Sequence, residues 1–559
     1  MRTIYRYILT LAAATLSVAA LAQNLDPTVE VSRAYEGSLV EVHKPVMEMA
    51  VPDSVQQFRL DFDYSVFDSP YKGSYEFNPY MTSMRPASSA FKPKVFYLRA
   101  GAGYRLYPTA DLIWSPSFKK GYKMDVYASH RSYVGDYRTI VPVASGDQFK
   151  LADDGSDWKG YDLATDAGVN GSYDWKKGVL RYGLSYMGIH SKDYLKTRGF
   201  DGANFSMGVN SKDAGDFVYD VDVNYRYASD KGAFRLKENY ASVDAGLGYK
   251  FKSLHQILFN VGVDMLHYAD GQDWSAARMH FTPHYLYEKG RWKVDAGLKV
   301  DFMMADKIPS IGLQQIVYPD VHVEFAAIKN AMSLYAAAVG NSVLNTYGDI
   351  VRRNHFADPT FFYGNGMDCT VERIKAILGL KGRIGTRFSY DFEGGYANYA
   401  NAIFDAVYVV PDMYSPAGIG YSSCNKAFAQ MNWLLVTERF RFDGNAQYAC
   451  YWGFESVAGL FAPSAFTGNA SMEYNIRKRI YFGVDCEFAT ARKMVAPFVE
   501  NVTYSIPGYA DLGFSVEVVT SRKLSFWARG GNLLNMTIQR VPLYAEGGIN
   551  FTAGLCLNL

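Results

Sequence analysis

Apolar and polar side chains alternate every second residue over long stretches of this chain, and this pattern constrains its fold most strongly. In FVYDVDVNYRYA (217–228), aromatic residues and valines hold the odd positions, whereas Asp, Asn and Arg hold most even positions. The stretch WKVDAGLKVDF (292–302) alternates in the same way. Successive side chains of a β-strand point to opposite faces, so each stretch predicts a strand with one apolar and one charged face.

The length of these strands indicates that they cross a membrane. Many runs span about 11–14 residues, enough for a tilted strand to traverse the hydrocarbon layer. An apolar face toward lipid and a polar face toward an aqueous lumen are typical of a transmembrane β-barrel. A water-soluble β-sandwich is the alternative, but it would use shorter strands whose apolar faces meet each other. We therefore expect an all-β, transmembrane antiparallel β-barrel.

Short and long connections alternate along the chain, which also favours a barrel. Short polar turns are predicted at 176–177, 212–215, 252–254, 288–290, 329–330, 383–385, 437–438, 477–478 and 521–522. Longer stretches rich in Gly, Pro, Asn and Asp lie at 132–161, 304–317, 340–370, 399–423 and 492–507. Barrels of the outer membrane have short periplasmic turns and longer outside loops. The pattern predicts a barrel over residues 94–559 with about 22 strands, within a range of about 20–24.

The first residues have the pattern of a secretory signal peptide. Arg2 and Arg6 precede an apolar run that begins at Ile8, and the small residues of 20–22 form a cleavage site. An uncleaved anchor is the alternative, but the apolar run is short for a membrane span. We expect residues 1–22 to be removed. Residues 23–93 are interrupted by prolines, so we expect an extended periplasmic or lumenal segment there.

Composition and motifs argue against nucleic-acid binding, enzymatic activity and a bound cofactor. The 57 basic and 56 acidic residues nearly cancel, whereas nucleic-acid-binding domains are strongly basic. The five cysteines include no CxxC pair, and His280 with His284 lacks the further ligands of a zinc site. No G-x-S-x-G nucleophile motif is present. We therefore predict that the protein is not an enzyme and has no metal or other cofactor.

Three short pieces follow one another near the C-terminus: NLLN (532–535), PLY (542–544) and GGINFTAG (547–554). Their succession resembles the last hairpin of TonB-dependent receptors, and the strand count also matches that family. The stretches VEVSRAYEG, PDSVQQFRLDFDYSVF and VYPDVHVEF are similar to plug-poor, receptor-like outer-membrane proteins. The family's globular plug domain is too large for residues 23–93. The resemblance therefore implies a receptor-like outer-membrane barrel that lacks a conventional plug.

Two segments are candidates for contacts with envelope machinery. The first resembles a Ton box, which pairs with TonB by adding a strand, although an ordinary extended leader is the alternative; it comprises Asp26, Pro27, Thr28, Val29, Glu30 and Val31. The second is the last strand, INFTAGLCLNL, in which alternation turns toward lipid the side chains of Phe551, Leu555, Leu557 and Leu559. We expect the barrel assembly machinery to recognise this strand and the first strand to pair with it, leaving no open edge in the membrane.

The charged faces of the predicted strands form the candidate lumen wall. Its members are Asp220, Asp222, Arg226, Asp244, Asp295, Lys299, Asp301, Arg441 and Asp443. Charges of both signs can pair into a network that stiffens the wall, or line a route for polar solutes. A barrel of this size normally has a plugged lumen. We therefore expect the N-terminal segment, inward-folded loops or a partner to fill it.

These patterns predict an outer-membrane protein of a Gram-negative bacterium that transports or takes up a polar solute. The alternative is a barrel that does not transport, and serves as a scaffold or partner-binding component of an envelope complex. The expected partners are outer-membrane lipid, the barrel assembly machinery, and either TonB or a plug or lid protein. No nucleic-acid partner is expected.

Overall fold

A computed structural model of the chain describes residues 95–118, 121–142, 149–212, 216–232, 235–251, 254–269, 274–305, 314–357, 368–410, 413–455, 459–495 and 505–559. The predicted signal peptide (1–22), the N-terminal segment (23–93) and the Ton-box-like stretch Asp26–Val31 lie outside the described residues.

The described residues are almost entirely strand and turn. The strands are β1 (Phe96–Tyr104), β2 (Thr109–Trp114), β3 (Tyr122–Arg138), β4 (Ile140–Pro142), β5 (Phe149–Leu151), β6 (Asp157–Asp174), β7 (Gly178–Lys192), β8 (Thr197–Ser211), β9 (Phe217–Asp230), β10 (Lys237–Phe251), β11 (His255–Ala269), β12 (Trp274–Lys289), β13 (Trp292–Ala305), β14 (Gln314–Ile328), β15 (Met332–Leu344), β16 (Cys369–Ile384), β17 (Phe388–Val410), β18 (Met413–Val436), β19 (Phe440–Trp452), β20 (Leu460–Phe461), β21 (Phe466–Ile476), β22 (Ile480–Ala489), β23 (Arg492–Lys493), β24 (Ser505–Ile506), β25 (Tyr509–Val519), β26 (Leu524–Gly531) and β27 (Asn550–Asn558). A helix, α2 (Tyr347–Arg353), lies between β15 and β16. Within the described ranges, no helix is both long enough and apolar enough to cross a membrane.

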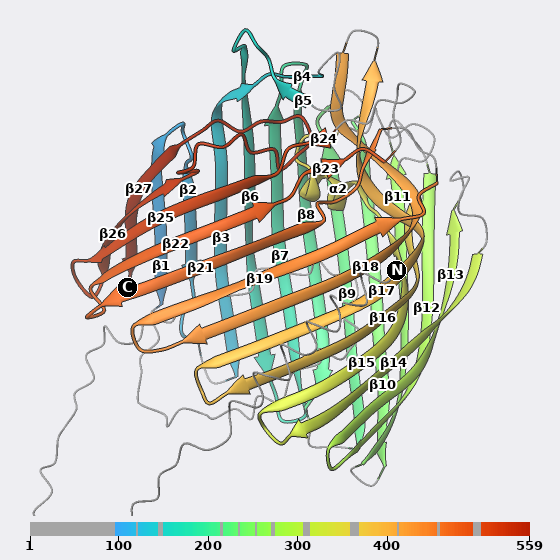
Figure 1. Cartoon of the computed structure of the whole chain (residues 1–559). Helices are drawn as coiled ribbons and strands as arrows, with labels where there is room; N and C mark the ends of the chain where they lie inside the picture. Colours follow the sequence, from blue (N-terminus) through green and yellow to red (C-terminus); the bar gives the residue numbers. More distant parts are fainter. Residues whose placement is uncertain are drawn as a thin grey trace, which may run out of the picture. The chain divides into compact units, whose positions relative to one another are not determined.

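Twenty-two of the described strands close into one antiparallel barrel (Figure 1). Each barrel strand pairs with the next barrel strand in the sequence, and β1 pairs with β27 to complete the ring. That last ladder runs from Tyr97 opposite Asn558 to Tyr104 opposite Phe551, and the amide of Leu559 donates to the carbonyl of Phe96 at 2.8 Å. The predicted fold class and strand number are therefore confirmed.

The alternation of side chains produces two chemically different faces. On β11, most exposed side chains are apolar and include Ile257, Phe259 and Val261, whereas the side chains between them include the buried polar residues Asn260 and Asp264. The exposed apolar faces of neighbouring strands join into an outer surface that suits a hydrocarbon environment. The inner face carries the polar and charged groups, as in other transmembrane barrels.

The longest hairpin departs from the sequence prediction. Residues 399–423 were expected to form a loop, but β17 and β18 continue their ladder until Val410 pairs with Met413. Apolar packing explains the extension: Ala402, Phe404 and Leu460 form one buried cluster, and β20 adds a further pairing with β17. Strand structure therefore extends well into the end of the barrel that carries the long connections, which we call the long-loop end.

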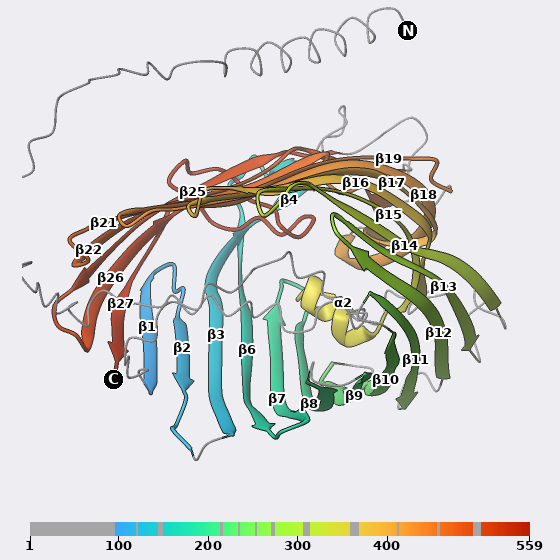
Figure 2. The ribbon, with the colours of Figure 1, turned by 90° about the horizontal axis from the view of Figure 1, so that it is seen from below.

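The connection between β15 and β16 turns into the barrel. Seen along the barrel, α2 lies inside the ring of strands rather than outside it (Figure 2). Its first turn forms hydrogen bonds to side chains of β9, β10 and β11, all on the inner wall. Among the fillers considered from the sequence, an inward-folded loop is thus present in the described part of the chain.

Candidate functional site

The inward segment Asn345–Ala357, which we call the inward loop, begins with a well-formed helix cap. Thr346 has an extended backbone, and its hydroxyl accepts a hydrogen bond from the amide of Asp349 at 3.2 Å. This satisfies one of the amide groups that a helix leaves unpaired at its first turn. A helix of seven residues is nonetheless marginal on its own. Its stability must therefore come from packing against the barrel wall.

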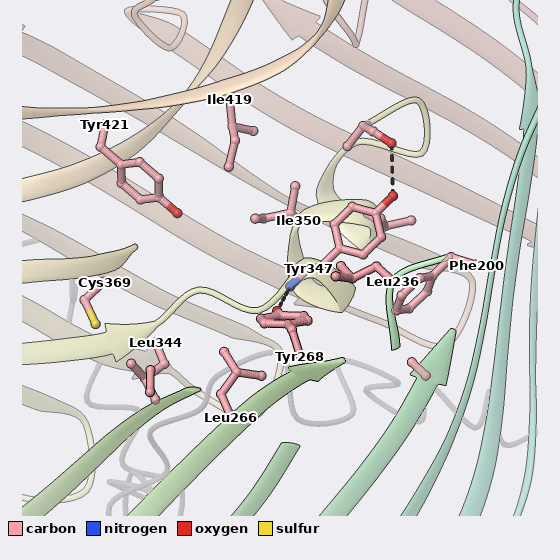
Figure 3. Packing of buried hydrophobic residues seen from close by; sticks show 14 of the residues in the cluster. Phe200, Leu236, Leu266, Tyr268, Leu344, Tyr347, Ile350, Cys369, Ile419 and Tyr421 are labelled. Carbon is pink, nitrogen blue, oxygen red and sulfur yellow. Dashed lines mark hydrogen bonds between the residues drawn. The ribbon is translucent and has the colours of Figure 1, made fainter. Parts of the chain in front are cut away.

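Apolar side chains supply part of that packing (Figure 3). Tyr347, Ile350 and Val351 of α2 are almost fully buried in a cluster that includes Phe200 on β8 and Leu266 on β11. The rings of Tyr347 and Phe200 meet edge to face with their centroids 5.2 Å apart. Burying one such side chain contributes about 1.5–3 kcal/mol. These apolar contacts hold the helix against the wall, but they do not involve polar groups that could recognise a ligand.

Polar contacts at the start of α2 are more specific. Glu238 on β10 is fully buried, and its carboxylate accepts hydrogen bonds from Tyr268 on β11 at 2.9 Å and from the amide of Gly348 at 3.0 Å. The hydroxyl of Tyr268 in turn accepts from the amide of Tyr347 at 2.8 Å. Two backbone amides of the first helical turn are thus satisfied by the barrel wall, which fixes both the position and the direction of the helix.

Arg226 on β9 joins the wall to the helix. Its Nε donates to Glu238 at 2.9 Å, its Nη1 donates to Asp349 at 3.0 Å, and its Nη2 donates to the hydroxyl of Thr346. Partial burial of Asp349 would raise the pKa of its carboxyl, but the guanidinium of Arg226 and the Thr346 hydroxyl outweigh that effect and lower the pKa. Asp349 is therefore ionised when the inward loop is in this position.

The polar network continues along the inner wall to the base of the inward loop. Tyr240 donates to Asp264 at 2.8 Å, and Asp264 pairs with Arg278 at 2.9 Å. Arg278 donates to the carbonyl of Ser342, near the end of β15, from which the inward loop departs. Both the helix and the strand that leads into it are thus held by charged groups of the wall.

The C-terminal end of the inward loop is also held by hydrogen bonds and an ion pair. His355 meets the carboxylate of Asp162 on β6 at 2.7 Å, and Ser191 on β7 donates to the carbonyl of His355 at 2.8 Å. Burial of the imidazole lowers its pKa, but the hydrogen bond and charge of Asp162 outweigh this and raise the pKa of His355 above its usual value. The same end carries Arg353, which lies 3.7 Å from Asp405 on the extended part of β17.

The inward loop also meets the connection between β26 and β27. Phe356 and Tyr544 stack with their ring centroids 4.0 Å apart, and both pack with Tyr133 and Tyr137 of β3 in a buried group that we call the aromatic latch. The hydroxyl of Tyr544 donates to the buried Asp193 at 2.7 Å. Two long connections that are far apart in the sequence are therefore joined inside the long-loop end.

The residues predicted to line the lumen lie on the face opposite the exposed apolar side chains, and most are paired. Asp220 and Asp222 share Arg181, and Arg441 pairs with Asp443 at 2.8 Å. Further contacts are Asp244 with His280 at 3.5 Å, Asp295 with His284 at 3.4 Å, and Lys299 with Asp301 at 4.0 Å. Of the predicted set, Arg226 has a direct contact with α2.

Several residues of this site were not singled out from the sequence. Glu238, Tyr268 and Asp349 complete the arrangement around Arg226, and Asp264 with Arg278 extends it. One signal was available: Thr346 and Asp349 have the spacing of a helix N-cap pair, which predicts a helix start within a stretch that otherwise reads as a loop.

The described residues offer no obvious centre for metal binding or disulfide chemistry. Within the described ranges, no three His, Cys, Asp or Glu side chains are grouped so as to hold a metal ion. Each of the five cysteines is a free thiol.

Comparisons with known proteins bear on the fold. No protein-family model and no curated protein matches the sequence. The structure is similar to the FrpB iron transporter from Neisseria meningitidis, with a TM-score of 0.60 and 9% identity over 84% of this chain and 81% of that one. It is also similar to the siderophore receptor PirA from Acinetobacter baumannii and to the copper transporter OprC, each with a TM-score of 0.58 and 10% identity over 83% of this chain and 80% of the other. The chain therefore has the fold of these receptor and transporter barrels, in agreement with the predicted receptor-like architecture.

Proposed function

We propose that this receptor-like barrel resides in the outer membrane of a Gram-negative bacterium and takes up a polar solute through its lumen. The observation that carries the proposal is the inward loop, which a network of charged wall residues holds inside a closed 22-stranded barrel. The named structural relatives, an iron transporter, a siderophore receptor and a copper transporter, support transport as the general activity.

The inner wall favours a polar solute over an apolar one. Acidic and basic side chains pair with each other there, as in Arg181 with Asp222 and Arg529 with Asp485. Several of these groups remain partly exposed and can exchange one polar partner for another, which is how selective pores and transporters recognise solutes. In this proposal the inward loop is the gate, because it occupies the lumen and is held by contacts that can be exchanged.

Energy coupling forms a separate part of the proposal. Residues Asp26–Val31 would pair with TonB as an added strand, and the barrel assembly machinery would insert the protein among outer-membrane lipids. Deleting residues 26–31 is then expected to abolish accumulation of the solute in cells without lowering the amount of folded barrel in the membrane. Unchanged uptake by that variant would contradict coupling through this segment.

The uptake proposal can be tested with liposomes that contain the purified full-length protein. Swelling in isotonic arabinose would be compared among the full protein, a variant whose residues 346–357 are replaced by a Gly-Ser linker, and a variant that also lacks residues 23–93. We expect swelling above that of protein-free liposomes in at least the doubly shortened barrel. If none of the three admits arabinose, the uptake proposal fails and the scaffold alternative, which predicts a co-purifying partner, is favoured.

A further inference from the structure

The guanidinium of Arg226 has two sides with different partners. On one side, Nε faces Glu238, which is 0% exposed and belongs to the wall itself. On the other side, Nη1 and Nη2 face Asp349 and Thr346, which belong to the inward loop. Glu238 is thus a counter-ion that the wall itself supplies, whereas Asp349 is a counter-ion that the inward loop supplies.

The Asp349 carboxylate lies at the edge of this site. Its side chain is 43% exposed, whereas that of Arg226 is 11% exposed. The arginine also lies over the ring of Tyr240, with 5.2 Å between its guanidinium carbon and the ring centroid. The barrel wall therefore supplies a cation and an aromatic platform, and the inward loop supplies a carboxylate that pairs with the cation.

Removing the inward loop would leave a site with a definite chemistry. Glu238 would keep its hydrogen bonds from Arg226 and Tyr268, so the buried carboxylate would remain satisfied. Arg226 would instead lose its contacts with Asp349 and Thr346, leaving Nη1 and Nη2 without these acceptors. These two donors would then face the lumen and be available to another acceptor. The planar fork of the guanidinium is complementary to the two oxygens of a carboxylate.

We propose that Arg226 binds a carboxylate group of the solute and that Asp349 is an internal competitor for the same position. Solute and inward loop then exclude each other: an incoming carboxylate takes the Nη1 and Nη2 donors, and α2 leaves the wall. The inference rests on the proposed function, because the solute reaches Arg226 through the lumen. It adds the chemical class of the solute and a reason for the gate to respond to it.

Hydrogen–deuterium exchange of the inward loop tests this competition in the full-length protein. The amides of Tyr347 and Gly348 are hydrogen-bonded to wall side chains, so they report directly on undocking. Citrate is the probe, glycerol is the neutral comparison, and sodium chloride keeps the ionic strength constant because charge effects are screened by salt. We expect citrate, but not glycerol, to accelerate exchange in the segment 345–357.

Three variants separate competition from simple loosening. Asp349→Asn removes the competing charge, so the citrate concentration that gives half the effect should fall about tenfold, corresponding to about 1.4 kcal/mol. The pair Arg226→Gln with Glu238→Gln removes both charges of the wall together, and the citrate response should disappear. Arg131→Gln breaks an arginine–aspartate pair between β3 and β2, in which Arg131 lies 2.8 Å from Asp111, and should leave the response unchanged.

The outcomes distinguish this inference from the uptake proposal. The competition is overturned if citrate fails to accelerate exchange in both the wild type and Asp349→Asn, or if the doubly neutral wall variant responds like the wild type. Inorganic phosphate that acts as strongly as citrate would contradict the assignment of a carboxylate. Liposomes that admit arabinose without any citrate response would retain uptake and reject the competition. A citrate response in a barrel that admits no arabinose would retain the competition and reject uptake.

Discussion

Asp349 on α2 accepts a hydrogen bond of 3.0 Å from Arg226 on β9, although 123 residues separate the two in the sequence. This contact joins a seven-residue helix, which is too short to be stable alone, to the wall that surrounds it. Arg226, the wall residue of this pair, is buried and also pairs with a second carboxylate, that of Glu238. The two ends of the pair should therefore respond differently to mutation.

Arg226→Gln should destabilise the protein much more than Asp349→Asn. Without the arginine, Glu238 becomes a buried carboxylate with no cation, and breaking such a pair costs about 3–5 kcal/mol. Asp349 is partly exposed, so Asp349→Asn should cost about 1 kcal/mol. Urea titration of the refolded barrel in detergent measures both values. Adding Glu238→Gln to Arg226→Gln should restore part of the stability, and equal effects of the two single variants would contradict the assigned roles.

The inward loop should dock more firmly below neutral pH than above it. The pKa of His355 is raised in the folded protein because Asp162 holds the protonated ring. A group whose folded pKa is raised contributes its full stabilisation below its unfolded pKa of about 6.5. That contribution is lost as the pH rises through the higher folded value.

Exchange of the segment 345–357, normalised to the same peptide unfolded at each pH, measures this dependence. In the wild type, protection should be greatest below about pH 6.5 and should fall as the pH rises above that value. His355→Gln should show a flat profile over the same range. A wild-type profile as flat as that of the variant would show that the His355 contact with Asp162 does not control docking.

Phe356→Ala should release two connections at once. The ring stacks on Tyr544 and is buried in the aromatic latch, and truncating a buried phenylalanine costs about 3–5 kcal/mol. We expect faster exchange both in the inward loop and in residues 532–549, with the barrel strands unchanged. Phe205→Ala is a suitable control, because this ring lies on the exposed outer face of β8. Faster exchange in the inward loop alone would contradict a shared latch.

Lysine should be costly on the outer face of the barrel and tolerated on the inner face. Val261, near the middle of β11, is exposed on the apolar face, and a lysine at the bilayer midplane costs about 2–4 kcal/mol. Gln447 lies on the inner face of β19, between outward-facing neighbours such as Tyr448. Folding into lipid vesicles should therefore be impaired by Val261→Lys and not by Gln447→Lys. The reverse order would mean that the faces are assigned wrongly.

The barrel was predictable from the sequence because the patterns that specify it, alternating side chains and short turns, are local and repeat along the chain. The alternation in β9 and β13 specifies both the strands and their faces, since one residue of slippage would turn every charge toward lipid. The turns at 288–290 and 477–478 are equally local. Closure follows from the need to leave no unpaired edge in the membrane.

The site could be predicted only in part. Arg226 was identified as an inward charge by its position in the alternation, but its partners Glu238 and Asp349 depend on how a distant connection folds. The sequence from 399 to 423 contains glycine and prolines and was interpreted as a loop, whereas tertiary packing around Phe404 and Leu460 extends the strands there. Long-range packing of this kind leaves little trace in local patterns.

Single-channel recording in planar bilayers tests the central claim most directly, because it detects a gated lumen without knowledge of the solute. The full-length protein is compared with the variant in which a Gly-Ser linker replaces residues 346–357. The account predicts that the loop-shortened barrel conducts in larger and more frequent steps than the wild type, and that Asp349→Asn falls between them. Identical traces from all three proteins, whether silent or conducting, would contradict a gate formed by the inward loop.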